Sequence, residues 1–471
     1  MLLDGSNPYA SGGPAQIVLT PEDFEFHISD TNLKAVSREA DWLVLYYIGA
    51  DNNLAEQLFE NVRQLKSMGS SERVHVCVFF SGPWLTDSFF ARLNPGGTLV
   101  DDMIGRFIKV PCNDPKVMGE ILTNTIHLFP ARRRLMVLSS HGNGWAGMLR
   151  SDDLHKELCR SGRLRFPLPS LDTWEQRIAD CNRSEMSRIN AHRQALGIDQ
   201  PTTRPRMLDV VALDACHMGN IEALQPFVQC AHFVVSSEER EADCGYPADH
   251  LLRVLLDNPD IDSETLARRL VVLAAEAQAK RMREVGVDED AVTQTAFDLS
   301  HWERVCAAIG RLGASLVEQM TQTGVEAVAI AVTNTYGLPL GCRDIKGFAE
   351  NLQNGDLSPR VRQAAAEVSS LFEGDGFIIE SRVPGGRYLP NGLSINLPDP
   401  PAFDPRYLSV MSTMPDDFAP WVHFLEVRAL LSRQKDGLSP AVMDYIRDLN
   451  STVNPETPDT GMELSDPPTP K

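Results

Sequence analysis

The chain has 471 residues, 43% of them hydrophobic and 23% charged, which is typical of a soluble globular protein with a substantial core. Its 64 acidic and 44 basic residues leave a formal net charge of −20, which argues against sequence-independent nucleic-acid binding because such binding depends on Lys and Arg. No apolar run approaches the length of a transmembrane helix, and residues 1–21 lack the basic start and apolar centre of a signal peptide. We therefore expect a cytoplasmic protein with no nucleic-acid or membrane partner.

The hydrophobic pattern alternates short apolar runs with longer periodic segments, which indicates strands alternating with helices. Strands are expected at 16–19, 42–48, 74–80, 88–93, 104–110, 135–138, 210–216, 233–236, 295–299, 325–332 and 376–381. Helices are expected at 54–68, capped by Asn or Asp, and at 117–129, 171–196, 220–230, 263–285 with Ser263 as the N-cap, 302–320, 344–353, 360–372 and 422–431. Such an order predicts a largely parallel sheet with helices on both faces.

Two of these strands end in residues that can carry out chemistry. The run 210–216 ends in Asp214-Ala215-Cys216, and the run 135–138 leads through two serines to His141 in a glycine-rich turn. Ligands of open α/β sheets bind outside the carboxyl ends of the strands, so a thiol and an imidazole could meet there as a nucleophile and its base. Asp214 and Cys216 should point the same way if the strand continues through Ala215. A cysteine at a strand end is, however, most often a small buried hydrophobe.

Several segments resemble clostripain-like cysteine peptidases of the caspase/gingipain/separase clan. The His and Cys motifs of that family are matched by 140–145 (SHGNGW) and 213–219 (LDACHMG). Further matches follow in consistent order at 42–54, 236–239, 245–247, 295–300, 344–349 and 392–398. The resemblance implies a caspase-like three-layer α/β/α sandwich with a mostly parallel central sheet over residues 41–400. The arm 1–40, a helical segment 401–450 and a disordered tail 451–471 complete the expected organisation.

The resemblance also implies a catalytic dyad of Cys216 and His141. A free thiol is mostly protonated at neutral pH, so Cys216 needs a base to become a nucleophile. His141 would accept that proton and later protonate the leaving amine. The backbone N–H groups of Gly142 and Cys216 are the expected oxyanion hole. His217 is a rival base, but neighbouring strand residues point apart, which favours a structural role for it.

In the family, the acid two residues before the cysteine lies in the S1 pocket and binds a basic substrate side chain. That residue is Asp214 here, and the resemblance implies cleavage after Arg, in preference to Lys, because a guanidinium pairs with a carboxylate through two parallel hydrogen bonds. The alternative is that Asp214 only orders its turn. Four further residues match motif positions near the pocket, namely Asp51, Asn52, Ser236 and Glu238. The acids of 239–243 are either a calcium loop or a solvated turn, since they lack a recognisable ligand spacing.

An arginine-rich segment at 148–207 separates the two catalytic motifs. Because relatives are often activated by self-cleavage, we expect maturation after an Arg or Lys of this insertion, by the enzyme itself or by an activating protease or regulator. The analogy further suggests an intracellular regulatory or defence cascade acting on proteins with exposed Arg or Lys. Two other hypotheses are a catalytically silent scaffold that binds basic peptides through Asp214, and a thiol redox sensor, which lacks a visible resolving cysteine. The nine scattered cysteines, without a C-x-x-C pair, predict neither a disulfide framework nor a structural zinc site. No cofactor is expected to be required.

Overall fold

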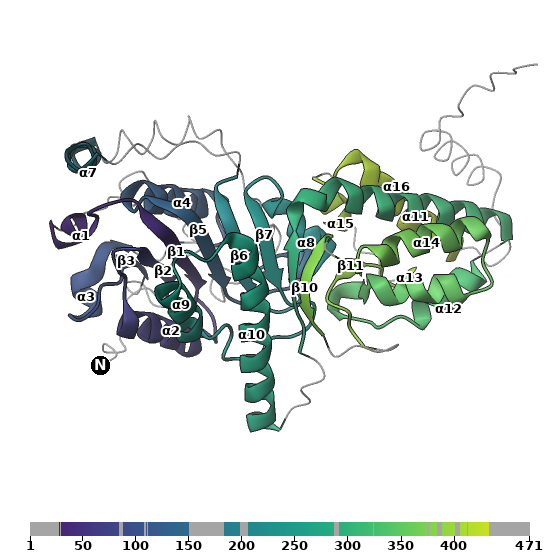
Figure 1. The fold of residues 1–471 in the computed structure, drawn as a ribbon. Helices are drawn as coiled ribbons and strands as arrows, with labels where there is room; N and C mark the ends of the chain where they lie inside the picture. Colours follow the sequence, from purple (N-terminus) through teal and green to yellow (C-terminus); the bar gives the residue numbers. More distant parts are fainter. Residues whose placement is uncertain are drawn as a thin grey trace, which may run out of the picture.

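The computed structural model describes residues 28, 30–83, 88–107, 110, 112–149, 183–197, 206–286, 292–323, 325–374, 376–383, 389–400, 406–411 and 413–432. Within them, a nine-stranded sheet has the order β10-β8-β7-β6-β5-β1-β2-β3-β4 (Figure 1). Its strands are β1 (Ala40–Gly49), β2 (Val74–Ser81), β3 (Ser88–Arg92), β4 (Met103–Phe107), β5 (Ala131–Ser139), β6 (Leu208–Asp214), β7 (Ala231–Ser236), β8 (Gln294–Asp298) and β10 (Ile378–Arg382).

The centre of the sheet is parallel and its flanks are antiparallel. Strands β2, β1, β5, β6 and β7 pair in parallel, whereas β3, β4, β8 and β10 pair antiparallel. All the side chains of β1 and β2 are buried, as expected of strands covered on both faces. The parallel pairing brings the carboxyl ends of the central strands to one edge of the sheet.

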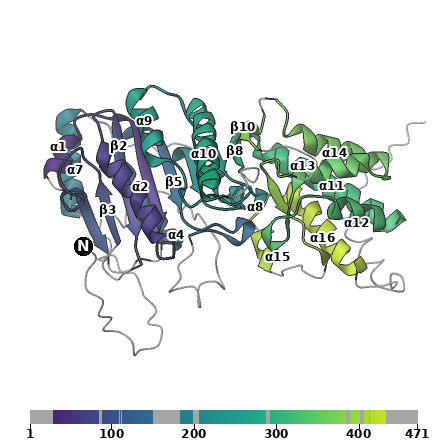
Figure 2. The same cartoon turned by 90° about the horizontal axis from the view of Figure 1, so that it is seen from below.

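Helices cover both faces, so that the molecule has three layers (Figures 1 and 2). One face packs against α2 (Ala55–Met68), α9 (Ala248–Asp257) and α10 (Ser263–Val285), and the other against α4 (Pro115–Leu128) and α8 (Ile221–Leu224). Helix α2 buries Leu58, Val62 and Leu65, whose spacing places them on one side of a helix. Two shorter helices, α1 (Asp30–Ala35) and α3 (Leu99–Asp102), lie near the β4 end of the sheet.

A helical region follows β8 and lies beyond the β10 end of the sheet (Figures 1 and 2). It contains α11 (Trp302–Thr323), α12 (Glu326–Thr333), α13 (Ile345–Asn354), α14 (Pro359–Ser370), α15 (Arg406–Met411), α16 (Ala419–Ser432) and the strand pair β9 (Cys342–Asp344) and β11 (Ser394–Asn396). The strand predicted at 325–332 is therefore wrong. Val328, Ala331 and Val332 are buried while Ile330 is 56% exposed, a helical spacing that the β-branched composition concealed.

The helix ends correct two further expectations. The N-cap of α10 is Asp262, whose carboxylate accepts the N–H of Thr265, and not Ser263. Helix α2 begins after Leu54 without a side-chain cap, although the Asn52 side chain accepts the Leu54 N–H.

The predicted strand 16–19, the tail 451–471, residues 433–450 and most of the insertion 148–207 lie outside the described residues. Of the insertion, helix α7 (Arg183–Leu196) is described, and Arg188 in it donates to the Ile28 carbonyl and pairs with Asp30. Among the described helices, none has both the length and the apolar character needed to span a membrane.

Candidate active site

The two sequence motifs leave the sheet side by side, from neighbouring parallel strands. Ser139, at the end of β5, is in register with Asp214, at the end of β6, and the Ser140 N–H donates to the Asp214 carbonyl. His141 and Cys216 each follow two residues after that registered pair. The topology therefore brings the predicted base and nucleophile to the same edge of the sheet.

Gly142 is where the two loops touch. A Cβ atom added to Gly142 would lie 2.4 Å from the carbonyl oxygen of Cys216 and 2.9 Å from the Cβ of Ala215. The His141 loop then folds back on itself, because the Leu149 N–H donates to the His141 carbonyl. Glycine is needed at residue 142 because any side chain would push the His141 loop away from the Cys216 loop.

Cys216 lies in a turn and is half-buried. Strand β6 ends at Asp214, so the expected continuation through Ala215 is wrong, and the orientation of Cys216 is set by the turn. The sulfur accepts the backbone N–H of Glu241 at 3.4 Å. Burial raises the pKa of the Cys216 thiol, and the negative charge of the Glu241 carboxylate adds to this effect while its N–H opposes it. The Cys216 thiol is thus protonated at rest and would need a base in order to act as a nucleophile.

The His141 imidazole is half-buried and hydrogen-bonded. Its Nε2 lies 2.7 Å from the side-chain oxygen of Asn53, which is exposed in the turn after β1. Sequence reasoning missed Asn53, although it stands in the first matched segment beside the predicted Asn52. Asn52 itself is buried and donates to the Gly49 carbonyl and to the Ser140 hydroxyl. It therefore braces the β1 turn against the residue before His141.

His217 is held in place by the chain after β7. It adopts a left-handed conformation, with φ of 61°. Its backbone N–H donates to the Glu239 carbonyl at 2.9 Å, and its Nδ1 donates to the Glu238 carbonyl at 3.2 Å. Burial lowers the pKa of the His217 imidazole. These contacts fit the structural role that we expected for it.

Asp214 is buried at the end of β6, on the face of the sheet covered by α9 and α10. Its carboxylate accepts the Ser139 hydroxyl at 2.7 Å and the Tyr246 N–H at 3.0 Å. Burial raises the pKa of Asp214 to about 6, against the opposing effect of these hydrogen bonds. Gly245, with φ of +56°, packs so closely that a Cβ there would lie 2.5 Å from an Asp214 oxygen. The chain after β7 therefore closes directly over this carboxyl group.

Glu241 is a second acid at this position that sequence reasoning did not assign to the pocket. Burial raises the pKa of Glu241, and the nearby Asp214 carboxylate raises it further. The Gln294 amide donates to Glu241 at 2.5 Å and accepts the Tyr246 hydroxyl at 2.8 Å. The sequence signal was present in the acidic turn 238–243, but a turn does not reveal which of its acids points inward.

Ser236, Glu238 and Asp51, the remaining predicted residues, interact with other groups in the structure. Ser236 is in register with Leu213, which packs in the core on the face of the sheet opposite to Asp214. Glu238 directs its carboxyl group to the Gly392 N–H and to Asp344. The charge of Asp51 acts on Cys112, raising the pKa of that thiol further than burial alone does.

The other acids of the 239–243 turn have partners of their own. Glu239 accepts the Tyr336 hydroxyl at 2.6 Å, and Asp243 pairs with Arg281. Within the described ranges, no group of three or more His, Cys, Asp or Glu side chains is arranged to hold a metal ion.

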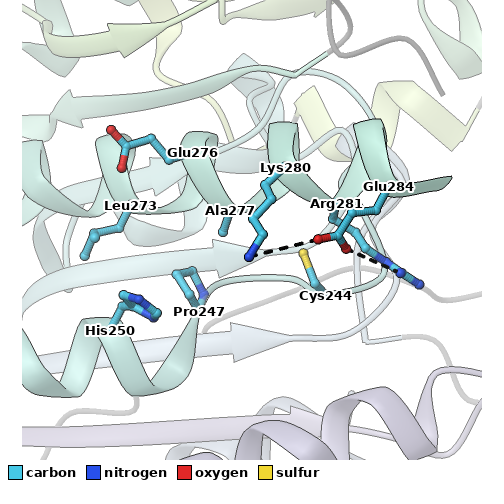
Figure 3. Close-up of a pocket in the computed structure, with 9 residues that line it drawn as sticks. All are labelled: Cys244, Pro247, His250, Leu273, Glu276, Ala277, Lys280, Arg281 and Glu284. Atoms are coloured by element: carbon cyan, nitrogen blue, oxygen red, sulfur yellow. Dashed lines mark ion pairs between the residues drawn. The ribbon is translucent and has the colours of Figure 1, made fainter. Parts of the chain in front are cut away.

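A cavity of about 340 Å³ lies between the chain at 244–250 and helix α10 (Figure 3). Cys244, Pro247 and His250 form one wall, and Leu273, Ala277 and Lys280 of α10 form the other. Glu284 forms ion pairs with Lys280 and Arg281 at one end. The residues that line this cavity include neither Cys216 nor Asp214.

Comparison with known proteins agrees with this geometry. The model of the clostripain family (peptidase C11) matches residues 180–352, which include Asp214, Cys216 and Glu241 but not His141. No curated protein is similar enough in sequence to match the chain. The resemblance to the clostripain family predicted from the motifs is thus confirmed over the matched residues, and the match supports a cysteine peptidase.

This chain matches two solved structures over nearly their whole length. One is an inactive zymogen of a C11 protease from Parabacteroides distasonis, with a TM-score of 0.52, 16% identity, and 81% of this chain and 98% of that chain covered. The other is a secreted C11 cysteine protease from Bacteroides thetaiotaomicron in complex with an irreversible peptide inhibitor, with a TM-score of 0.51, 15% identity, and 82% and 99% covered. These likenesses confirm the predicted caspase-like α/β fold with a mostly parallel central sheet.

Proposed function

We propose that the protein is a cysteine endopeptidase that cleaves after Arg, and less efficiently after Lys, with Cys216 as nucleophile and His141 as base. The observation that carries this proposal is the convergence of four groups at one sheet edge. The Cys216 and His141 loops touch through Gly142. The buried acids Asp214 and Glu241 lie beside them, and the Glu241 N–H reaches the Cys216 sulfur.

The chemistry follows from the state of the thiol. Because burial raises the pKa of Cys216, the thiol proton must pass to His141 before the sulfur can attack the substrate carbonyl carbon. The oxyanion that forms would be stabilised by the N–H groups of Gly142 and Cys216. His141 then gives the proton to the leaving amine, and water hydrolyses the thioester with His141 again acting as base.

The preference for Arg follows from the paired acids. Burial raises the pKa of both Asp214 and Glu241, and repulsion from the Asp214 charge raises that of Glu241 further, whereas a hydrogen bond with Glu241 opposes the rise at Asp214. A guanidinium group would relieve that repulsion and can donate to both carboxylates in its plane. A lysine ammonium supplies the charge without the planar fork, so we expect weaker selection of Lys.

Maturation by cleavage within residues 148–207, by the enzyme itself or by an upstream protease, is a further part of the proposal. The insertion joins the His141 and Cys216 motifs and is rich in the residues that the S1 acids would select. One structural neighbour is an inactive zymogen of a C11 protease. The cytoplasmic location, a role in a regulatory or defence cascade, and any calcium dependence stay predictions.

Hydrolysis of fluorogenic peptides that differ only in the residue before the cleaved bond (Arg, Lys, Asp or Leu) tests the proposal. The assay compares wild type with Cys216→Ala, before and after limited trypsin treatment and with added calcium. We expect turnover of the Arg and Lys peptides only, abolished in Cys216→Ala. Tight binding of the Arg peptide without turnover, after every activation step, would instead support the scaffold hypothesis. Labelling of Cys216 by a peptidyl-Arg acyloxymethyl ketone, read by intact mass, distinguishes the two hypotheses independently.

A further inference from the structure

We propose that Asn53 is a positioning residue for the reaction, because it fixes the tautomer and the orientation of the His141 imidazole. The inference rests on the function proposed above, since it assigns a third member to the Cys216–His141 pair. It starts from the contact between His141 Nε2 and the Asn53 side-chain oxygen at 2.7 Å. An amide oxygen can only accept a hydrogen bond, so Nε2 must carry the proton in this contact.

The turn that bears Asn53 is tied to the His141 loop by its neighbour. The Asn52 side chain donates to the Gly49 carbonyl at 2.9 Å and to the Ser140 hydroxyl at 3.3 Å, and it accepts the Leu54 N–H at 2.9 Å. The Ser140 hydroxyl also donates to the Gly49 carbonyl at 2.8 Å. The end of β1 and the residue before His141 therefore move as one unit, which holds an otherwise exposed asparagine at a constant distance from the ring.

The tautomer decides which ring nitrogen can act as the base. With the neutral ring protonated at Nε2, the lone pair is on Nδ1, which accepts the proton when the S–H bond of Cys216 breaks. The thiolate then forms a bond to the substrate carbonyl carbon, and the imidazolium keeps its Nε2–H on Asn53. When the C–N bond breaks, the Nδ1 proton leaves with the amine, and the ring returns to its starting tautomer. Asn53 gains and loses no proton, and it orients the ring through every step.

A neutral amide suits this role because it adds no charge to the site. The Asp214–Glu241 pair already contributes negative charge close to Cys216, and the Glu241 carboxylate raises the pKa of the thiol. A carboxylate in place of Asn53 would stabilise the imidazolium and raise the pKa of His141. An amide accepts the same Nε2–H and leaves the proton easier to release to the leaving amine.

The first experiment measures the ring directly and needs no enzymatic activity. The full chain is labelled with ¹⁵N-histidine in a Cys216→Ala background, and His141 is assigned by comparison with His141→Gln. NMR correlation of the ring nitrogens and protons then gives its tautomer and pKa. We expect Nε2–H to be essentially the only tautomer with Asn53, and the fraction of the Nδ1–H tautomer to increase in Asn53→Ala. Asn53→Asp should raise the pKa of His141 by about one unit. Gln57→Ala, an exposed change in α2, is the matched control and should alter neither.

The second experiment measures kcat and KM in the Cys216-containing chain with the Arg peptide. Asn53→Ala should lower kcat about tenfold or more, as expected when an acid–base group is misaligned, and change KM less than about twofold. Asn53→Asp keeps the acceptor and should recover part of kcat, with a displaced pH profile. An unchanged tautomer and pKa of His141 in Asn53→Ala, or an unchanged kcat, would overturn the proposal. Absence of turnover in wild type after activation would refute the proposed function, while the NMR result would still decide whether Asn53 orients the ring.

Discussion

Replacing Asp214 with Asn should make the folded protein more stable above about pH 6 and should remove the proposed selection of Arg. The Asp214 carboxyl is buried, and its pKa is raised to about 6 from an ordinary value of 3.8. That difference corresponds to about 3 kcal/mol of unfavourable free energy for holding the ionised form in the folded state. The penalty is absent well below pH 3.8, grows as the pH rises from 3.8 to about 6, and is complete at pH 8. Asparagine avoids it because an amide is neutral and can still accept the Tyr246 N–H.

Urea unfolding at pH 4 and pH 8 measures the effect, in a Cys216→Ala background that prevents self-digestion. Asp214→Asn should match the parent at pH 4 and exceed its free energy of unfolding by about 3 kcal/mol at pH 8. Asp243→Asn is the matched control from the same segment. Arg281 lowers the pKa of Asp243, so removal of the Asp243 carboxylate should slightly reduce the free energy of unfolding at pH 8. This change is opposite in sign to the one expected for Asp214→Asn. In the Cys216-containing chain, Asp214→Asn should lose turnover of the Arg peptide.

A loss of stability in Asp214→Asn that is equal at both pH values would refute this reasoning. Such a result would mean that the hydrogen bonds from Ser139 and Tyr246 outweigh the burial of the charge. Unchanged preference for Arg over Leu in the same variant would separately remove Asp214 from substrate selection, leaving Glu241 as the candidate acid.

Two further predictions follow from the loops at the same edge. Gly142→Ala should lower kcat by about a hundredfold, because its Cβ would meet the Cys216 carbonyl at 2.4 Å and displace an expected oxyanion donor; kinetics with the Arg peptide test this, and wild-type turnover would contradict it. Incubated wild-type protein should yield fragments cut after an Arg or Lys within 148–207, whereas Cys216→Ala should stay intact, because the insertion holds the residues that the proposed site selects. Intact mass spectrometry measures both proteins, and equal fragmentation would exclude self-cleavage.

The parts of the fold that the sequence predicted best are those where local pattern and tertiary environment agree. The apolar runs 42–48, 135–138 and 210–213 lie within β1, β5 and β6, because the parts of a strand that are buried on both faces need no polar positions. The ends of these strands could be predicted for the same reason, because the apolar run stops where polar residues such as Asp214 begin at the edge of the sheet. The segment 325–332 shows the opposite case. Its β-branched residues favour a strand, but packing against the neighbouring helices selects the helical spacing of α12.

The orientation of a site residue could be predicted from the sequence only where that residue belongs to a strand. Asp214 is still part of β6, so its face follows from the alternation of side chains along the strand. Glu238 and Glu241 stand in the chain after β7, where no period applies and tertiary contacts alone decide which acid turns inward. Glu238 turns to Asp344, and Glu241 turns to Asp214. Asn53 escaped notice for a related reason: its contact with His141 joins two turns that are far apart in the sequence.

The chain from 236 to 247 contacts His217, Cys216 and Asp214. Its backbone holds His217 through the Glu238 and Glu239 carbonyls, reaches the Cys216 sulfur through the Glu241 N–H, and closes over Asp214 at Tyr246. The same segment is anchored to the helical region, since Glu238 contacts Asp344 and Gly392 and Glu239 contacts Tyr336. In the proposed mechanism, a substrate arginine that enters between Asp214 and Glu241 would therefore act on the peptide group whose N–H contacts the Cys216 sulfur. The proposed mechanism would thus couple binding of arginine by the two acids to the environment of the Cys216 thiol, and the contacts of Glu238 and Glu239 would connect the helical region to the same segment.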